Sequence, residues 1–182
     1  QIGSFSLVPL PDHFVHLQWE APNESLQLHY HWPTQSDALL TMLRDIGISH
    51  VHYHHLLGVD PEIMLIPQQL GITYDFTAHD YYTAFPQIAL VDTHHNYCVE
   101  QGLAQCTACL AQRPAPTGES IEDWRLRHRL FLHNARYLLT PSRDAAQRLQ
   151  RYFPTANLRF APHLDMATDA TVPQPHPRRL ST

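Results

Sequence analysis

Lysine is absent from this 182-residue chain, in which all 12 basic residues are arginine. A phosphate-binding loop of the Walker type needs a lysine that reaches the phosphates, and Schiff-base or pyridoxal-phosphate chemistry needs a lysine amine. Protein kinases likewise need a catalytic lysine. The chain alone therefore excludes these three chemistries.

Cysteine and glycine are also scarce, with three and six residues respectively. Three cysteines are too few for a disulfide framework and fit a reducing compartment, which favours a cytoplasmic protein. No Gly-x-Gly-x-x-Gly motif supports a dinucleotide site. No run of residues approaches the roughly 18 to 20 apolar residues of a membrane span. The net charge of −5 argues against a nucleic-acid partner.

Secondary-structure signals divide the chain into an N-terminal β region and an alternating α/β region. Proline-containing turns separate three strand-like runs before residue 35, which predict an antiparallel meander at 5–8, 14–19 and 26–30. Helical patterns are then expected at 37–46, 61–70, 119–134 and 142–152. Short strands are expected at 48–55, 72–78, 136–140 and 157–161. The segment 79–117 is expected to be irregular.

Helices that alternate with short apolar strands predict right-handed parallel crossovers. The expected core order is β-α-β-α-β, a long loop, and then α-β-α-β. These features define an α/β fold with a Rossmann-like, open and mainly parallel sheet flanked by helices, preceded by the antiparallel meander.

Polar side chains occur where the predicted parallel strands end. Because ligands of such sheets bind beyond the carboxyl ends of the strands, we expect a candidate site at this edge. Histidine acts as a general base near neutral pH or donates to a phosphate or a sugar hydroxyl, and arginine at a helix N-terminus can hold an anion. The alternative is that these groups only cap the strands. They are His54, His55, His79, Asp80, Ser142, Arg143 and His163.

Two further patterns suggest a metal. His50, His52 and His54 alternate and so share one face of a strand, which indicates either a metal site or histidines that pack between sheet and helix. Cys98, Cys106 and Cys109 have the spacing of part of a structural zinc site, with His94 or His95 as the fourth ligand. The alternative for the cysteines is three reduced thiols.

The stretch 113–151 contains eight arginines opposed by four acidic residues. One interpretation is a basic face for a phosphate-bearing acceptor or an anionic membrane surface. The other is a solvated helix face.

Several of these motifs resemble the N-terminal domain of retaining bacterial GT-B glycosyltransferases of the glycosyltransferase-4 type. The segment 52–58 is similar to a characteristic strand end of that family, and His79-Asp80-Tyr81-Tyr82 with 86–92, 97–98 and 106–110 is similar to its next loop. Thr140-Pro141-Ser142-Arg143, the helix ending at 151–154 and Pro162-His163 resemble the close of the domain. The similarity covers about residues 37–165.

The resemblance implies the acceptor-side domain of a two-domain enzyme over residues 1–165, followed by a linker at 166–182. A second, absent domain would bind the nucleotide-sugar and carry the family's paired glutamates, so the chain is expected to be an inactive fragment of a hexosyltransferase. The partners implied are that donor domain and a glycan or lipid-linked acceptor for surface polysaccharide synthesis. The implied location is the cytoplasm, with a peripheral contact at the inner face of the membrane.

Among individual residues, His79 matches the family's cleft histidine, which contacts the sugar or acceptor near the reacting centre. Asp80 follows it in the motif, and His54 and His55 match the neighbouring strand end. The family needs no metal for transfer, so zinc would be structural. Related sequences often have a cysteine where this chain has Phe85, and this departure favours a histidine ligand or no metal. The competing hypothesis is a non-catalytic, zinc-stabilised binding module.

Overall fold

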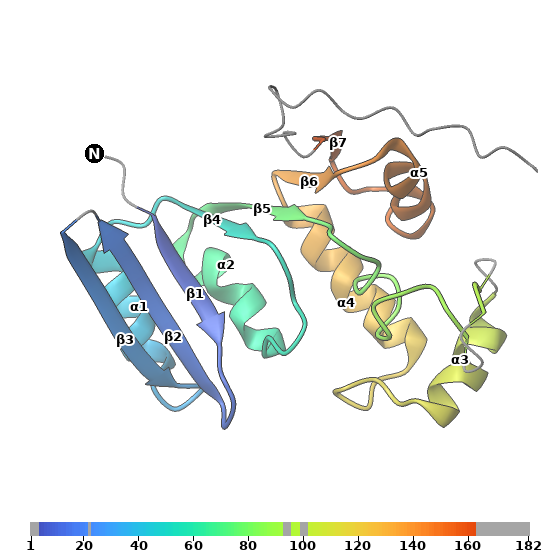
Figure 1. Cartoon of the computed structure of the whole chain (residues 1–182), viewed down its shortest axis with the longest axis horizontal. Coiled ribbons are helices and arrows are strands. Elements are labelled where there is room, and N and C mark those ends of the chain that lie inside the picture. Colours follow the sequence, from blue (N-terminus) through green and yellow to red (C-terminus); the bar gives the residue numbers. More distant parts are fainter. Residues whose placement is uncertain (1–3, 22, 93–95, 99–101, 163–182) are drawn as a thin grey trace, which may run out of the picture.

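The computed structural model describes residues 4–21, 23–92, 96–98 and 102–162, and its strands form two sheets (Figure 1). The first is antiparallel, in the order β1 (Phe5–Pro9), β2 (Phe14–Ala21) and β3 (Glu24–His31). The second is parallel, in the order β4 (His50–Tyr53), β5 (Thr73–Thr77), β6 (Tyr137–Thr140) and β7 (Leu158–Phe160). With helices flanking the parallel sheet, the predicted α/β fold with an N-terminal meander is confirmed.

Apart from α3 (Leu103–Gln112), the helices of the described residues begin and end close to the residues that the sequence indicates. They are α1 (Ser36–Asp45), the 3-10 helix η1 (Pro61–Leu65), α2 (Ile66–Leu70), α4 (Ile121–Asn134) and α5 (Arg143–Tyr152). Side-chain oxygens cap three of them at the N-terminus, where backbone N–H groups have no partner within the helix. These caps are Asp60 for η1, Ser120 for α4 and Ser142 for α5.

Helix α3 corrects the expectation that the whole segment 79–117 is irregular. Its sequence, LAQCTACLAQ, is rich in alanine, leucine and glutamine, which favour helix. Cys106, Cys109 and Leu110 are its buried residues, at the spacing of one helix face. The two cysteines resemble a metal motif, but their spacing of three also serves an amphipathic helix.

The expected core order needs a second correction at its first strand. The strand before α1 is β3, and it pairs with β2 in the antiparallel sheet and not with β4. A distinct apolar core holds that sheet against α1, η1 and α2. It contains Val15, Leu17, Trp32, Leu39, Leu40, Leu43, Ile63 and Ile66.

The parallel sheet packs its main core on one face. Because neighbouring parallel strands follow each other along the chain, right-handed crossovers place α2, α4 and α5 on the same face, and α4 lies beneath β5 and β6 in Figure 1. Tyr53, Tyr74, Phe76 and Leu138 contribute to the core there. Alternate residues point to the opposite face, so His50, His52, Asp75 and Thr77 share it.

The predicted linker at 166–182 lies outside the described residues. In the part of the chain that is described, no helix is long and apolar enough to cross a membrane.

Candidate functional site

Four of the predicted site residues lie together at the carboxyl ends of β4 and β5. His54 and His55 follow β4, and His79 and Asp80 follow β5. These strands pair in parallel, so the two segments leave the sheet at the same edge. The four side chains form two contacts, one between His54 and His79 and one between His55 and Asp80.

The His54 and His79 imidazoles meet nearly edge to edge. His54 Nδ1 lies 3.3 Å from His79 Nε2, and the ring centroids are 5.6 Å apart with 23° between the planes. Both residues are exposed. The pair is therefore accessible to a ligand at the edge of the sheet.

The His55–Asp80 pair links the two strand ends. His55 Nε2 lies 2.5 Å from one Asp80 carboxylate oxygen, while the Leu57 N–H donates to His55 Nδ1 at 2.8 Å. The other Asp80 oxygen accepts the Tyr82 N–H at 2.8 Å. This hydrogen-bond network assigns the His55 proton to Nε2, because Nδ1 accepts. His55 is thereby oriented toward Asp80, and both of its ring nitrogens have partners.

The His52 ring packs against the His54 ring. Their rings stack with centroids 4.4 Å apart and planes 15° apart, and His52 Nε2 contacts Thr77 Oγ1 at 2.8 Å. Burial, and next the nearby His54, lower the pKa of His52. His52 is therefore a neutral neighbour of the His54–His79 contact at pH 7.

Asp75 lies on the same face of the sheet as His52, and its carboxylate binds two side chains there. Its carboxylate accepts from Arg136 Nε at 3.0 Å and Arg136 Nη2 at 2.5 Å. It also contacts His50 Nε2 at 3.0 Å, and His50 Nδ1 contacts Thr73 Oγ1 at 2.9 Å. His50 and His52 thus bond to the neighbouring strand, β5. No sequence pattern predicted this Asp75–Arg136 pair, whose members are 61 residues apart.

We expect Asp75→Asn to destabilise the fold at neutral pH. The hydrogen bonds from Arg136 hold the pKa of Asp75 below its usual value, although burial opposes them. A lowered folded-state pKa contributes stability above the unfolded-state pKa, and this contribution is lost as the pH falls through the folded-state pKa. The Asn variant should therefore have a thermal midpoint several degrees lower at pH 7.

Thermal unfolding followed by circular dichroism at pH 7 and pH 3 measures this effect. Wild type and Asp75→Asn should differ most at pH 7 and converge at acid pH. Glu122→Gln, which neutralises an exposed carboxylate on α4, is the matched control and should leave the pH dependence near wild type. An equal difference at both pH values would contradict the assignment.

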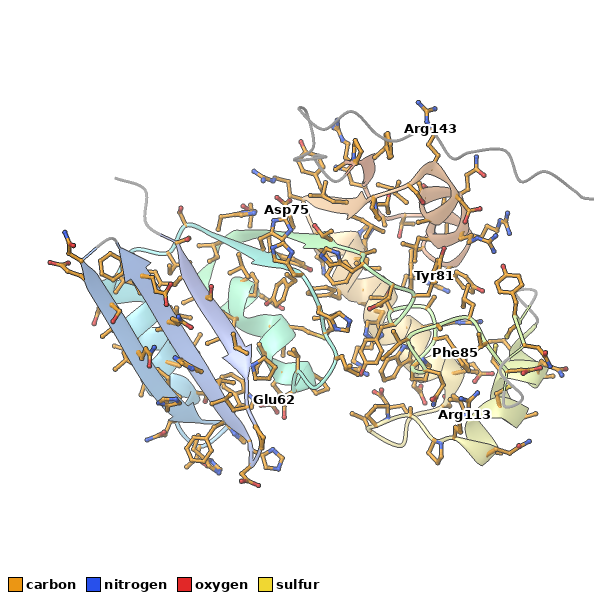
Figure 2. The ribbon with its side chains drawn as sticks, in the orientation of Figure 1. Glu62, Asp75, Tyr81, Phe85, Arg113 and Arg143 are labelled. Carbon is orange, nitrogen blue, oxygen red and sulfur yellow. The ribbon has the colours of Figure 1, made fainter. Side chains whose placement is uncertain are left out.

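Of the remaining predicted site residues, the two that the structure describes have other partners. Ser142 Oγ accepts the Ala145 N–H at 3.1 Å as the N-cap of α5. The Arg143 guanidinium lies 5.5 Å from the centre of the Phe160 ring, and its side chain extends outward from α5, away from Asp75 (Figure 2). His163 lies outside the described residues.

The three cysteines are buried thiols. Cys106 and Cys109 pack with Phe85, Leu90, Leu110 and Ile121. Burial, and next Cys106, raise the pKa of the Cys98 thiol, which disfavours the thiolate that binds zinc. Within the described ranges, no three His, Cys, Asp or Glu side chains are arranged to hold a metal ion. The thiols as placed do not fit zinc by themselves, and His94 and His95 lie outside the described residues.

Part of the arginine-rich stretch has a structural use that neither sequence interpretation included. Arg125 Nε donates to the Ala84 carbonyl at 3.0 Å, and its guanidinium lies 4.8 Å from the centre of the Tyr152 ring. Arg127 pairs with Glu119 at 2.5 Å. These arginines therefore connect α4 to the loops around it.

Trp124 of α4 anchors the loop that carries His79 and Asp80. Its side chain is 1% exposed, and its indole N–H donates to the Tyr82 carbonyl at 2.9 Å. The neighbouring His128 contacts the Trp124 carbonyl through Nδ1 at 2.8 Å, and burial lowers the pKa of His128 to about 4. His128 is neutral at pH 7 and serves the core. In the sequence, the spacing of four residues between Trp124 and His128 indicates that both side chains lie on one face of the helix.

A separate hollow lies between the β1–β2 turn and the loop after β4. His13, Trp32 and Gly58 are among the residues that line it, and the four residues of the candidate site are not. The candidate site is thus a surface edge of the sheet, defined by side-chain contacts.

No protein-family model matches this chain. No curated protein and no solved structure matches it either.

Proposed function

We propose that this chain is the acceptor-side domain of a glycosyltransferase that moves a sugar from a nucleotide-sugar to a glycan or lipid-linked acceptor. The contact between His79 and His54 supports the proposal most directly. The resemblance gives His79 the role of a cleft histidine, and the two rings meet at the carboxyl edge of a parallel sheet, where such folds bind ligands.

The chemistry of this edge suits a sugar hydroxyl. Imidazoles both donate and accept hydrogen bonds, and His54 and His79 are exposed. Asp80, the residue after His79, is held by His55 and the Tyr82 N–H. The proposal assigns nucleotide-sugar binding to a second domain. It also includes surface polysaccharide synthesis and a peripheral membrane contact through the arginine-rich region.

Glycan binding by the chain tests this proposal. Saturation-transfer NMR with a panel of bacterial surface oligosaccharides should detect binding to wild type. His79→Ala should weaken that binding roughly tenfold, which corresponds to the loss of one hydrogen bond of about 1 to 1.5 kcal/mol. His133→Ala, on the exposed side of α4, is the control and should bind as wild type does. Equal binding by His79→Ala and wild type would remove His79 from the site.

The second candidate is a non-catalytic zinc-stabilised binding module, in which the three buried cysteines would need a fourth ligand such as His94 or His95. Metal analysis of the purified chain separates the two candidates. One zinc ion per chain, whose removal by a chelator unfolds the protein, together with no glycan binding, would favour the module.

A further inference from the structure

The arrangement of His54 and His79 restricts how many protons the two rings can hold. Their facing nitrogens are 3.3 Å apart. The centroid separation of 5.6 Å and the 23° angle between the planes place both nitrogens between the two rings, close to a common plane. This is the geometry of an N–H···N hydrogen bond, and not of two rings stacked face to face.

An N–H···N hydrogen bond needs one proton between its two nitrogens. A neutral imidazole carries one N–H and one acceptor nitrogen, whereas a protonated imidazole carries two N–H groups. One protonated ring can still donate to a neutral partner, and the bond is then charge-assisted and stronger. If both rings were protonated, each would point an N–H group at the other, and the two positive charges would repel.

We infer that His54 and His79 act as one proton-sharing pair, which holds a proton between its rings and takes up a single additional proton while the rings remain in contact. This inference deepens the proposed function and rests on it for its biological role, because it concerns the site that would receive the sugar hydroxyl. The pair presents no more than one positive charge, so it suits a hydroxyl group better than a diphosphate.

The charged and titratable neighbours are consistent with a pair limited to one charge. On β4, His52 stacks on His54 at 4.4 Å, and burial, and next the nearby His54, lower the pKa of His52. His50 and Asp75 lie further along the same face, where Arg136 pairs with the Asp75 carboxylate. Asp80, beside His79 in the chain, is paired with His55. A second proton on the pair would therefore meet a third imidazole, while Asp75 and Asp80 already have cationic or N–H partners.

Imidazole NMR of the whole 182-residue chain between pH 5 and 9 tests the inference without any ligand. In wild type, the ring nitrogens of His54 and His79 should report complementary tautomers, one donor and one acceptor. Both rings should respond together to a first proton, and a second proton should bind only about one pH unit or more lower, with loss of the contact between the rings, as coupled sites do.

Two variants make the result decisive. In His54→Asn, an amide that does not titrate replaces the imidazole at the same distance from the backbone. His79 should then titrate in a single step, at a lower pH than the step at which the wild-type pair takes up its first proton as the pH falls. His79→Asn should have the reciprocal effect on His54. His133→Asn replaces an exposed histidine on α4 and should leave both steps unchanged.

Independent titration of His54 and His79 in wild type, with a His79 midpoint that does not change in His54→Asn, would overturn the inference. Because no glycan is present, this outcome is distinct from failure of the proposed function. A coupled pair in a chain that binds no glycan would retain the proton-sharing inference and reject the glycosyltransferase proposal.

Discussion

His79→Ala should lower the rate of sugar transfer by roughly 100-fold or more, in the range of a positioned acid–base or hydrogen-bonding group. The substitution should be made in a polypeptide that joins this chain to a donor-binding domain, since the proposal assigns the nucleotide-sugar to that domain. The reason for the large effect is position: the resemblance puts His79 near the reacting centre, and the ring contacts His54 at 3.3 Å.

Radiolabelled sugar transfer to an acceptor lipid or oligosaccharide measures this rate. His133→Ala is the matched control, because it removes an exposed histidine of α4 and should transfer at the wild-type rate. His54→Ala should be intermediate, since His79 would remain without its partner. Transfer by His79→Ala at the wild-type rate would exclude a role for this residue in the reaction.

Trp124→Ala should have the largest effect on stability, at about 3 to 5 kcal/mol. The indole is buried against Tyr82, with ring centroids 4.9 Å apart, and it donates to the Tyr82 carbonyl. Its removal opens a cavity in the main core and leaves that carbonyl without its donor. The thermal midpoint should fall by roughly 10 °C or more.

Thermal unfolding of three variants separates these contributions. Trp124→Phe retains most of the ring volume and removes the donor, so its loss should be smaller than that of Trp124→Ala. Leu130→Ala lies on the same helix but is 57% exposed, and its effect should stay within about 0.5 kcal/mol. A Trp124→Ala midpoint within a few degrees of wild type would show that α4 does not anchor the loop.

The local parts of the fold follow from the sequence because they depend on short-range patterns. Strands in the meander alternate apolar and polar residues, as in β2, where Val15 and Leu17 are buried. Ser120 and Ser142 mark helix starts through capping chemistry that involves residues three positions apart. Helix α3 was missed because the spacing of Cys106 and Cys109 fits both a metal motif and a helix face.

The sequence by itself determined the α/β class and the placement of His54, His55, His79 and Asp80 at strand ends. Only the tertiary structure decided which side chains meet. His54 and His79 are 25 residues apart, and Asp75 and Arg136 are 61 apart. Their contacts depend on the register of neighbouring strands and on the rotamers that packing selects, and no local periodicity encodes either.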